Sequence, residues 1–188
     1  MEAADLYEIL GHPRGLVIDG TDLERRYHAA AFNVHPDRHQ TSDPRTQQLS
    51  TTATAALNRA YRTLRDPVLR GKYWLELHGV RLNGDNRVPA SMATLVFDVQ
   101  EQLDDFRQAG SETLRAQVTA VQATLEERLA KTQDALAAKY CTWSPSAAAQ
   151  PAALTDLQQH LAEINYLRTL LGDVEETLGE PRGTDRRH

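Results

Sequence analysis

Apolar residues recur at intervals of three and four positions along nearly the whole chain. This spacing gathers them on one face of a helix, whereas the strict alternation typical of a strand is nearly absent. The pattern therefore predicts an all-α protein. Turn-forming residues concentrate in 79–90, so we expect two groups of helices separated by a linker.

The first group is expected to contain four helical segments, at residues 5–10, 21–34, 43–65 and 67–77. Thr21 and Glu24 have the spacing of a capping box, which predicts that Thr21 caps the second segment. The apolar stripes predict a core that includes Tyr7, Leu10, Tyr27, Leu57, Tyr61 and Leu64, and the stripe of the third segment begins at Leu49. Tyr73 and Trp74 are expected to cover the junction between the two groups.

The second group is expected to contain three longer helices, at residues 89–108, at residues 111–140, and from residue 152 or 155 to residue 178. Gly110 separates the first two, and Ser111 is placed to cap the second. Short connections between long helices favour an antiparallel three-helix bundle. The predicted organisation is thus an N-terminal domain, a linker, a C-terminal bundle and a disordered tail poor in apolar residues, at 1–78, 79–88, 89–178 and 179–188.

His35-Pro36-Asp37 interrupts the first group between its two long helical segments. Pro36 cannot continue a helix, so the tripeptide is presented on a turn. The Asp37 carboxylate can accept two hydrogen bonds from the guanidinium of a partner arginine. On the preceding segment, Arg25, Arg26 and His28 are expected to face outward. They form either a small basic face that steers an acidic partner or an ordinary solvated surface.

Two other functions for the tripeptide are disfavoured. Catalysis by a His35–Asp37 pair would need a nucleophile and an oriented hydrogen bond, and the sequence carries no nucleophile motif. His35 and His39 have the i, i+4 spacing of metal ligands, but Pro36 prevents a continuous helix through them. The sequence therefore favours partner binding, with no metal, no cofactor and no enzymatic activity.

Composition narrows the class further. The formal net charge is −5, and residues 1–78 contain ten basic and ten acidic side chains. Nucleic-acid binding is thus not expected, because there is no excess of positive charge. Cys141, the single cysteine, can form neither an intramolecular disulfide nor a Cys-x-x-Cys zinc site. No signal peptide or membrane-spanning run is evident, so we expect a cytoplasmic protein that does not bind membranes.

The order of these motifs resembles a known family. Residues 5–11, His35-Pro36-Asp37 and residues 58–67 are similar to the J-domain, the module that stimulates heat-shock-type chaperone ATPases. The run 67–79, which ends in Leu77-His78-Gly79, resembles HscB, the J-domain co-chaperone of iron–sulfur cluster assembly. In that family a C-terminal three-helix domain follows the J-domain, as the pattern here also predicts.

This resemblance implies two partners. One is an HscA/DnaK-type chaperone, whose ATPase would be stimulated through His35, Pro36, Asp37, Arg25, Arg26 and Arg38. The other is an IscU-type iron–sulfur scaffold protein, bound through Phe97, Asp98, Glu101, Asp105 and Tyr166. The chain departs from the family at Ala93 and Thr94, which stand at apolar positions, and at Phe32, which stands at a basic one. A solvated acidic face is the alternative for the second set.

Two alternatives for the whole protein remain. A general J-domain adaptor would bring a different client to a DnaK-type chaperone. A helical structural or dimerisation protein would carry His35-Pro36-Asp37 by accident and would affect no ATPase.

Overall fold

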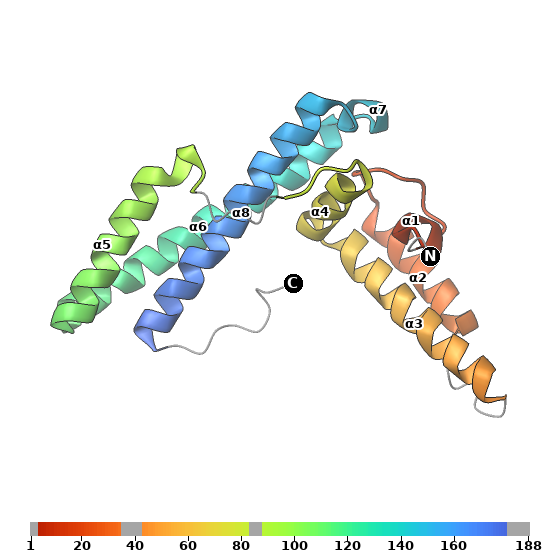
Figure 1. Cartoon of the computed structure of the whole chain (residues 1–188), viewed down its shortest axis with the longest axis horizontal. Coiled ribbons are helices and arrows are strands. Elements are labelled where there is room, and N and C mark those ends of the chain that lie inside the picture. Colours follow the sequence, from red (N-terminus) through yellow and green to blue (C-terminus); the bar gives the residue numbers. More distant parts are fainter. Residues whose placement is uncertain (1–3, 35–42, 83–87, 180–188) are drawn as a thin grey trace.

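The computed structural model describes residues 4–34, 43–82 and 88–179, and within these ranges the chain is helical, with no strand (Figure 1). The all-α prediction is confirmed. The elements are α1 Leu6–Ile9, α2 Gly20–Val34, α3 Pro44–Arg65, α4 Pro67–Leu77, the 3₁₀ turn η2 Ala90–Met92, α5 Ala93–Ala109, α6 Glu112–Thr142, α7 Pro145–Ala148 and α8 Pro151–Leu178.

Helices α2 and α3 form a hairpin, and α1 packs on α3 near the end where α4 begins (Figure 1). Aspartates cap three of these helices: the carboxylates of Asp5, Asp43 and Asp66 accept hydrogen bonds from backbone N–H groups in the first turns of α1, α3 and α4. Prolines occupy the first helical position of α3 and α4, where a missing N–H costs nothing. The predicted segment boundaries near 43, 65 and 67 are therefore confirmed.

The cap predicted for α2 is wrong. The helix begins at Gly20, and the Asp19 carboxylate accepts a hydrogen bond of 2.9 Å from the backbone N–H of Thr21. The Asp19 carbonyl accepts from the backbone N–H of Leu23, also at 2.9 Å. Thr21 thus lies inside the first turn, because Asp19 already satisfies the N–H groups that a cap must satisfy.

The predicted N-terminal core is confirmed, but the apolar stripe of α3 is not buried along its whole length. Leu57 and Leu64 are buried, but Leu49 is 63% exposed. At this end of the hairpin the side chain turned inward is Ser50, whose hydroxyl donates 2.7 Å to the carbonyl of Val34. Ser50 turns inward because the last carbonyls of α2 have no partner within the helix and need a donor. Leu49 stays exposed because the four-residue α1 packs only at the other end of α3 (Figure 1).

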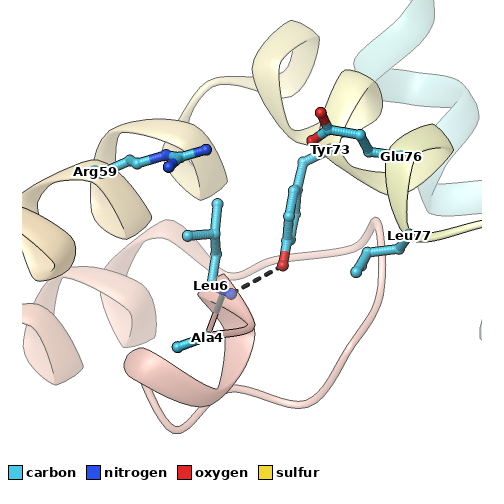
Figure 2. Close-up of a pocket in the computed structure, with 6 residues that line it drawn as sticks. All are labelled: Ala4, Leu6, Arg59, Tyr73, Glu76 and Leu77. Atoms are coloured by element: carbon cyan, nitrogen blue, oxygen red, sulfur yellow. Dashed lines mark hydrogen bonds between the residues drawn. The ribbon is translucent and has the colours of Figure 1, made fainter. Parts of the chain in front are cut away.

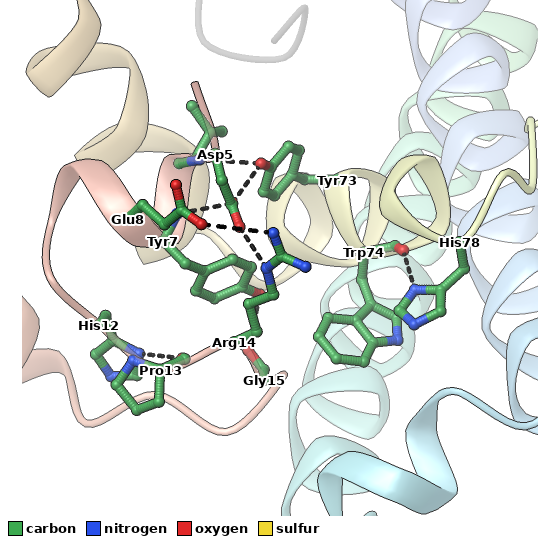
Figure 3. Close-up of polar contacts among 11 residues, drawn as sticks. Asp5, Tyr7, Glu8, His12, Pro13, Arg14, Gly15, Tyr73, Trp74 and His78 are labelled. Carbon is green, nitrogen blue, oxygen red and sulfur yellow. Dashed lines mark hydrogen bonds and ion pairs between the residues drawn. The ribbon is translucent and has the colours of Figure 1, made fainter. Parts of the chain in front are cut away.

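Trp74 and Tyr73 take different positions. Trp74 lies at the junction as predicted, and its indole N–H donates 3.0 Å to the carbonyl of Ala148 in α7. The expectation for Tyr73 is wrong, because its hydroxyl points back to α1 (Figure 3). That hydroxyl donates 2.6 Å to the Asp5 carboxylate and accepts 2.9 Å from the backbone N–H of Leu6.

Asp5 joins α1 to the rest of the N-terminal unit. Burial acts to raise its pKa, but hydrogen bonds from Tyr73, the backbone of Tyr7 and Arg14 outweigh burial and hold the pKa of Asp5 below its ordinary value. The group is therefore a carboxylate at neutral pH and anchors α1 against α4 as an acceptor.

The C-terminal group is the predicted three-helix bundle of α5, α6 and α8 (Figure 1). Gly110 ends α5 with a φ of 57°, and Ser111 caps α6, as expected. The buried side chains of its core are Met92, Val99, Leu103, Val118, Leu125, Leu167, Leu170, Leu171, Val174 and Leu178. Two details differ from the prediction: η2 precedes α5, and α7 lies within the stretch expected to be only a connection.

One hydrophobic core joins both groups of helices. Besides the N-terminal residues it contains Leu136, Tyr140, Ala148, Leu154, Leu157, Leu161 and Ile164 from α6, α7 and α8. Helix α4 forms the contact, since it packs on both α6 and α8. The division into 1–78, 79–88 and 89–178 stays a prediction of chain organisation, and the apolar contacts extend across it.

Gly71 lies at the closest approach in this junction. A Cβ atom there would lie 2.2 Å from the hydroxyl of Tyr140 and 3.2 Å from a Leu157 methyl. The Tyr140 hydroxyl is held by a 2.8 Å hydrogen bond that it donates to the carbonyl of Pro67. Only a glycine therefore lets α4 pack this closely on the bundle.

Gly71→Ala is expected to lower the free energy of unfolding by about 1–3 kcal/mol, because the added methyl group overpacks the junction. Chemical denaturation of the full chain measures this change. Gly172→Ala on α8 is the matched control, since nothing lies within 4 Å of its Cβ position. The control should be neutral or stabilising by up to about 1 kcal/mol. Equal stability of both variants would contradict the close packing at Gly71.

Candidate functional site

The predicted chaperone-binding loop is bounded by two well-defined helix ends. His35, Pro36, Asp37 and Arg38 themselves lie outside the described residues. On one side the carbonyl of Val34 accepts hydrogen bonds from the hydroxyls of Ser50 at 2.7 Å and Thr54 at 3.1 Å. On the other side Asp43 caps α3. The two ends of the loop are thus fixed to one another by the α2–α3 hairpin.

The basic residues predicted next to this loop are paired with acids. Arg25 is 71% exposed and Arg26 is half-buried, and both bind the carboxylate of Asp22. Arg26 also donates to the carbonyl of Gly11, which ties α2 to the end of α1. Hydrogen bonds from Arg26 and Arg25 keep the pKa of Asp22 below its ordinary value. Arg25 faces outward as predicted, whereas Arg26 is partly structural.

Asp22 is the residue that the sequence reasoning missed on this surface. Its spacing to Arg25 and Arg26 is i, i+3 and i, i+4, which is the spacing of helical ion pairs. That signal was present in the sequence. It shows that the face carries both signs of charge.

The predicted scaffold-binding residues fall into two positions. Phe97 is 69% exposed on α5, and Asp98, Glu101 and Asp105 are exposed on the same helix. They lie away from the face that buries Val99 and Leu103 in the bundle core. The four residues therefore form one acidic surface around an apolar ring.

Tyr166 belongs to a different helix. It lies on α8, partly buried against the core of the bundle. Among the described residues no hydrogen bond or ring contact joins it to Phe97 or to the three carboxylates of α5. Its membership in the same surface stays a prediction.

A hollow of about 290 Å³ lies between α1, α3 and α4 (Figure 2). Its lining is Ala4, Leu6, Arg59, Tyr73, Glu76 and Leu77. The Tyr73 hydroxyl is already engaged with Asp5 and Leu6. The hollow offers no nucleophile beside a base, so its lining does not support catalysis.

The described part of the chain offers no candidate metal site. Within it, no group of three or more His, Cys, Asp or Glu side chains is placed to hold a metal ion. Cys141 is exposed and unpaired with another cysteine. None of the described helices combines the length and the apolar character needed to cross a membrane.

Comparison with known proteins places the N-terminal helices in a family. Residues 5–73 match the DnaJ domain. This match covers α1, α2, α3 and the first part of α4, together with the loop that carries His35-Pro36-Asp37. The chain is therefore a J-domain protein.

Relatives extend the assignment beyond the J-domain. The chain is 35% identical over 138 residues to a co-chaperone protein HscB homolog of Bordetella petrii, which covers 71% of this chain and 81% of the relative. A co-chaperone protein HscB homolog of Chromobacterium violaceum is 32% identical over 133 residues, covering 66% and 76%. The chain belongs to the HscB family of co-chaperones.

Solved structures show the same fold. Chaperone HscB from Vibrio cholerae superposes with a TM-score of 0.64 at 20% identity, covering 92% of this chain and 96% of that one. Human co-chaperone protein HscB gives a TM-score of 0.64 at 18% identity, covering 92% and 81%. The arrangement of a J-domain followed by a helical bundle is thus shared.

Proposed function

We propose that this protein is a cytoplasmic co-chaperone of iron–sulfur cluster assembly. It stimulates the ATPase of an HscA/DnaK-type chaperone and delivers an IscU-type scaffold protein to it. The protein contributes no catalytic group and needs no cofactor. Its effect comes from binding one state of the chaperone more tightly than the other, which shifts the chaperone toward ATP hydrolysis.

The chaperone arm is the α2–α3 hairpin and its loop. His35, Pro36 and Asp37 bind the ATPase lobe, with Arg25, Arg26 and Arg38 assisting. The two hydrogen bonds to the carbonyl of Val34 support this assignment, because they hold the start of the loop against α3. An anchored helix end loses less conformational freedom when a partner binds beside it.

The client arm is the exposed surface of α5, where Phe97, Asp98, Glu101 and Asp105 meet a scaffold protein, with Tyr166 as a further contact. An exposed large apolar side chain within a rim of charge is typical of a protein-binding site. The observation that carries the proposal is the 69% exposure of Phe97, because a helix face that only contacts solvent has no need for a large apolar side chain.

The shared hydrophobic core gives the two arms a common frame. Helix α4 of the N-terminal group packs on α6 and α8, and Trp74 and Tyr140 hydrogen-bond across the junction. A client held on α5 is therefore presented at a defined position relative to the chaperone-binding loop. This arrangement fits a delivery protein.

The second candidate is a general J-domain adaptor for another client of a DnaK-type chaperone. It is favoured by the family departures at Ala93 and Thr94, which are both exposed at the start of α5. Under this alternative the chaperone arm is unchanged and the client differs.

Steady-state ATP hydrolysis by the cognate HscA-type chaperone tests the proposal, with and without the iron–sulfur scaffold. We expect the protein to raise the rate and the scaffold to raise it further in its presence. Stimulation that ignores the scaffold would favour the general adaptor. A rate unchanged by the protein, with its helicity verified by circular dichroism, would overturn the co-chaperone function.

A further inference from the structure

Three side chains form a ridge along the outer surface of α2. Arg25, His28 and Phe32 are spaced i, i+3 and i+7, which places them on one face of the helix. All three are exposed. The opposite face carries Leu23 and Tyr27 toward α1 and α3. The ridge therefore points to solvent and leads directly to the loop that contains His35.

The charges on this side of α2 largely cancel. Asp22 binds both Arg25 and Arg26, and the Glu24 carboxylate lies 3.8 Å from the imidazole of His28. Helix α2 contains two arginines and two carboxylates in all, so its formal charge is zero with histidine neutral. A neutral, internally paired face attracts a charged partner only weakly over a distance.

Phe32 is the largest apolar group on this ridge. Its side chain is 67% exposed, in the last turn of α2. The other exposed large apolar residues lie on different elements or in loops: Val17, Leu49, Val88 and Phe97. A helix that binds through anchors at i, i+3 and i+7 needs an apolar contact to retain its partner, and phenylalanine suits that role.

We propose that Phe32 is an apolar anchor through which α2 selects its chaperone. This inference rests on the proposed function. The partner surface is the ATPase lobe of the chaperone, and it presents an apolar pocket opposite Phe32 rather than an acidic patch. Selection then comes from burial of the phenyl ring, and a chaperone with a carboxylate at that point is bound less well.

The proposal also predicts how binding responds to salt. An association steered by exposed charges weakens steeply as ionic strength rises, whereas burial of an apolar ring does not. The ratio of half-saturating concentrations between Phe32→Ala and the wild type should therefore be the same at low and physiological salt, although the contacts of Asp37 and the arginines are screened.

The test compares four full-length variants with the wild type in titrations of chaperone ATPase stimulation. Phe32→Ala removes the anchor, Phe32→Leu keeps an apolar group, and Phe32→Arg introduces a charge. Leu49→Ala is the control, since Leu49 has a similar exposure of 63% but lies on α3. The titrations use the cognate HscA-type chaperone and a general DnaK-type chaperone, without scaffold.

With the cognate chaperone, we expect Phe32→Ala to raise the half-saturating concentration about tenfold, which corresponds to about 1.4 kcal/mol. Phe32→Leu should retain most of the affinity, and Leu49→Ala should match the wild type. Phe32→Arg should weaken binding to the cognate chaperone and improve binding to the general one.

The outcomes separate this inference from the proposed function. If the wild type stimulates the chaperone and Phe32→Ala does so with equal half-saturation, the anchor is excluded while the co-chaperone function stands. A loss for Phe32→Ala that appears only at low salt would likewise overturn the apolar anchor. If the wild type stimulates neither chaperone, the proposed function itself fails.

Discussion

Asp37→Asn is expected to weaken the stimulation of chaperone ATPase activity strongly while leaving the protein folded. The substitution keeps the size of the side chain but removes its charge and one of its acceptor oxygens. Hydrogen bonds to charged groups contribute about 1.5–3 kcal/mol, so affinity for the ATPase lobe should fall roughly 10- to 150-fold. His35→Gln should act in the same direction. Titrations of the cognate chaperone's steady-state ATP hydrolysis measure the loss.

Asp43→Asn provides a control with the same chemical change close to the same loop. The Asp43 carboxylate accepts hydrogen bonds from the backbone N–H groups of Arg45 at 3.0 Å and Thr46 at 3.1 Å, as the cap of α3. Asparagine caps helices about as well as aspartate. This variant should therefore stimulate like the wild type. Loss of stimulation in both variants would show that the loop responds to any lost charge, and retention in Asp37→Asn would remove Asp37 from the binding site.

Leu64→Ala is expected to lower the free energy of unfolding by about 2–5 kcal/mol. Leu64 is fully buried on α3, in the core that also includes Leu75 and Leu161. Truncation leaves a cavity that the surrounding helices fill only in part. Because this core joins both groups of helices, the loss should appear in the main unfolding transition of the full chain. Urea denaturation followed by circular dichroism measures it.

Leu49→Ala on the same helix makes the same truncation without the cavity. Leu49 is 63% exposed, so we expect a change within about 0.5 kcal/mol, as for most surface substitutions. Similar losses for the two variants would mean that Leu49 is buried in solution. Comparison of Leu64→Ala with Leu49→Ala thus shows which residues of the apolar stripe of α3 are buried in the core.

The helices of this protein could be predicted from the sequence because their signals are local. Asp66 followed by Pro67, or Gly110 followed by Ser111, marks a helix boundary through the backbone geometry and hydrogen bonding of adjacent residues. The stripe of α8 was also predictable, since its leucine, isoleucine and valine residues repeat on one face over the whole helix and all are buried. Membership in a J-domain family followed from local motifs in the same way.

The contents of the candidate sites were predictable only in part. The exposure of Phe97 and of the carboxylates on α5 follows from their position opposite Val99 and Leu103 on one helix. The pairing of Arg25 and Arg26 with a single carboxylate depends on side-chain conformations, although its i, i+3 and i, i+4 spacing was visible. The expected basic face was inferred from the cations of α2 alone, without the carboxylate of Asp22 that pairs with two of them.

The sequence by itself determined the helical class, the helix ends and the position of His35-Pro36-Asp37 between two helices, because each depends on residues a few positions apart. Only the tertiary structure decided the exposure of Leu49, the inward direction of Tyr73 and the place of Gly71 at the junction. These depend on which helices meet and where each one ends. Contacts between residues 71 and 140, or 5 and 73, arise only when distant segments pack, and no local pattern encodes them.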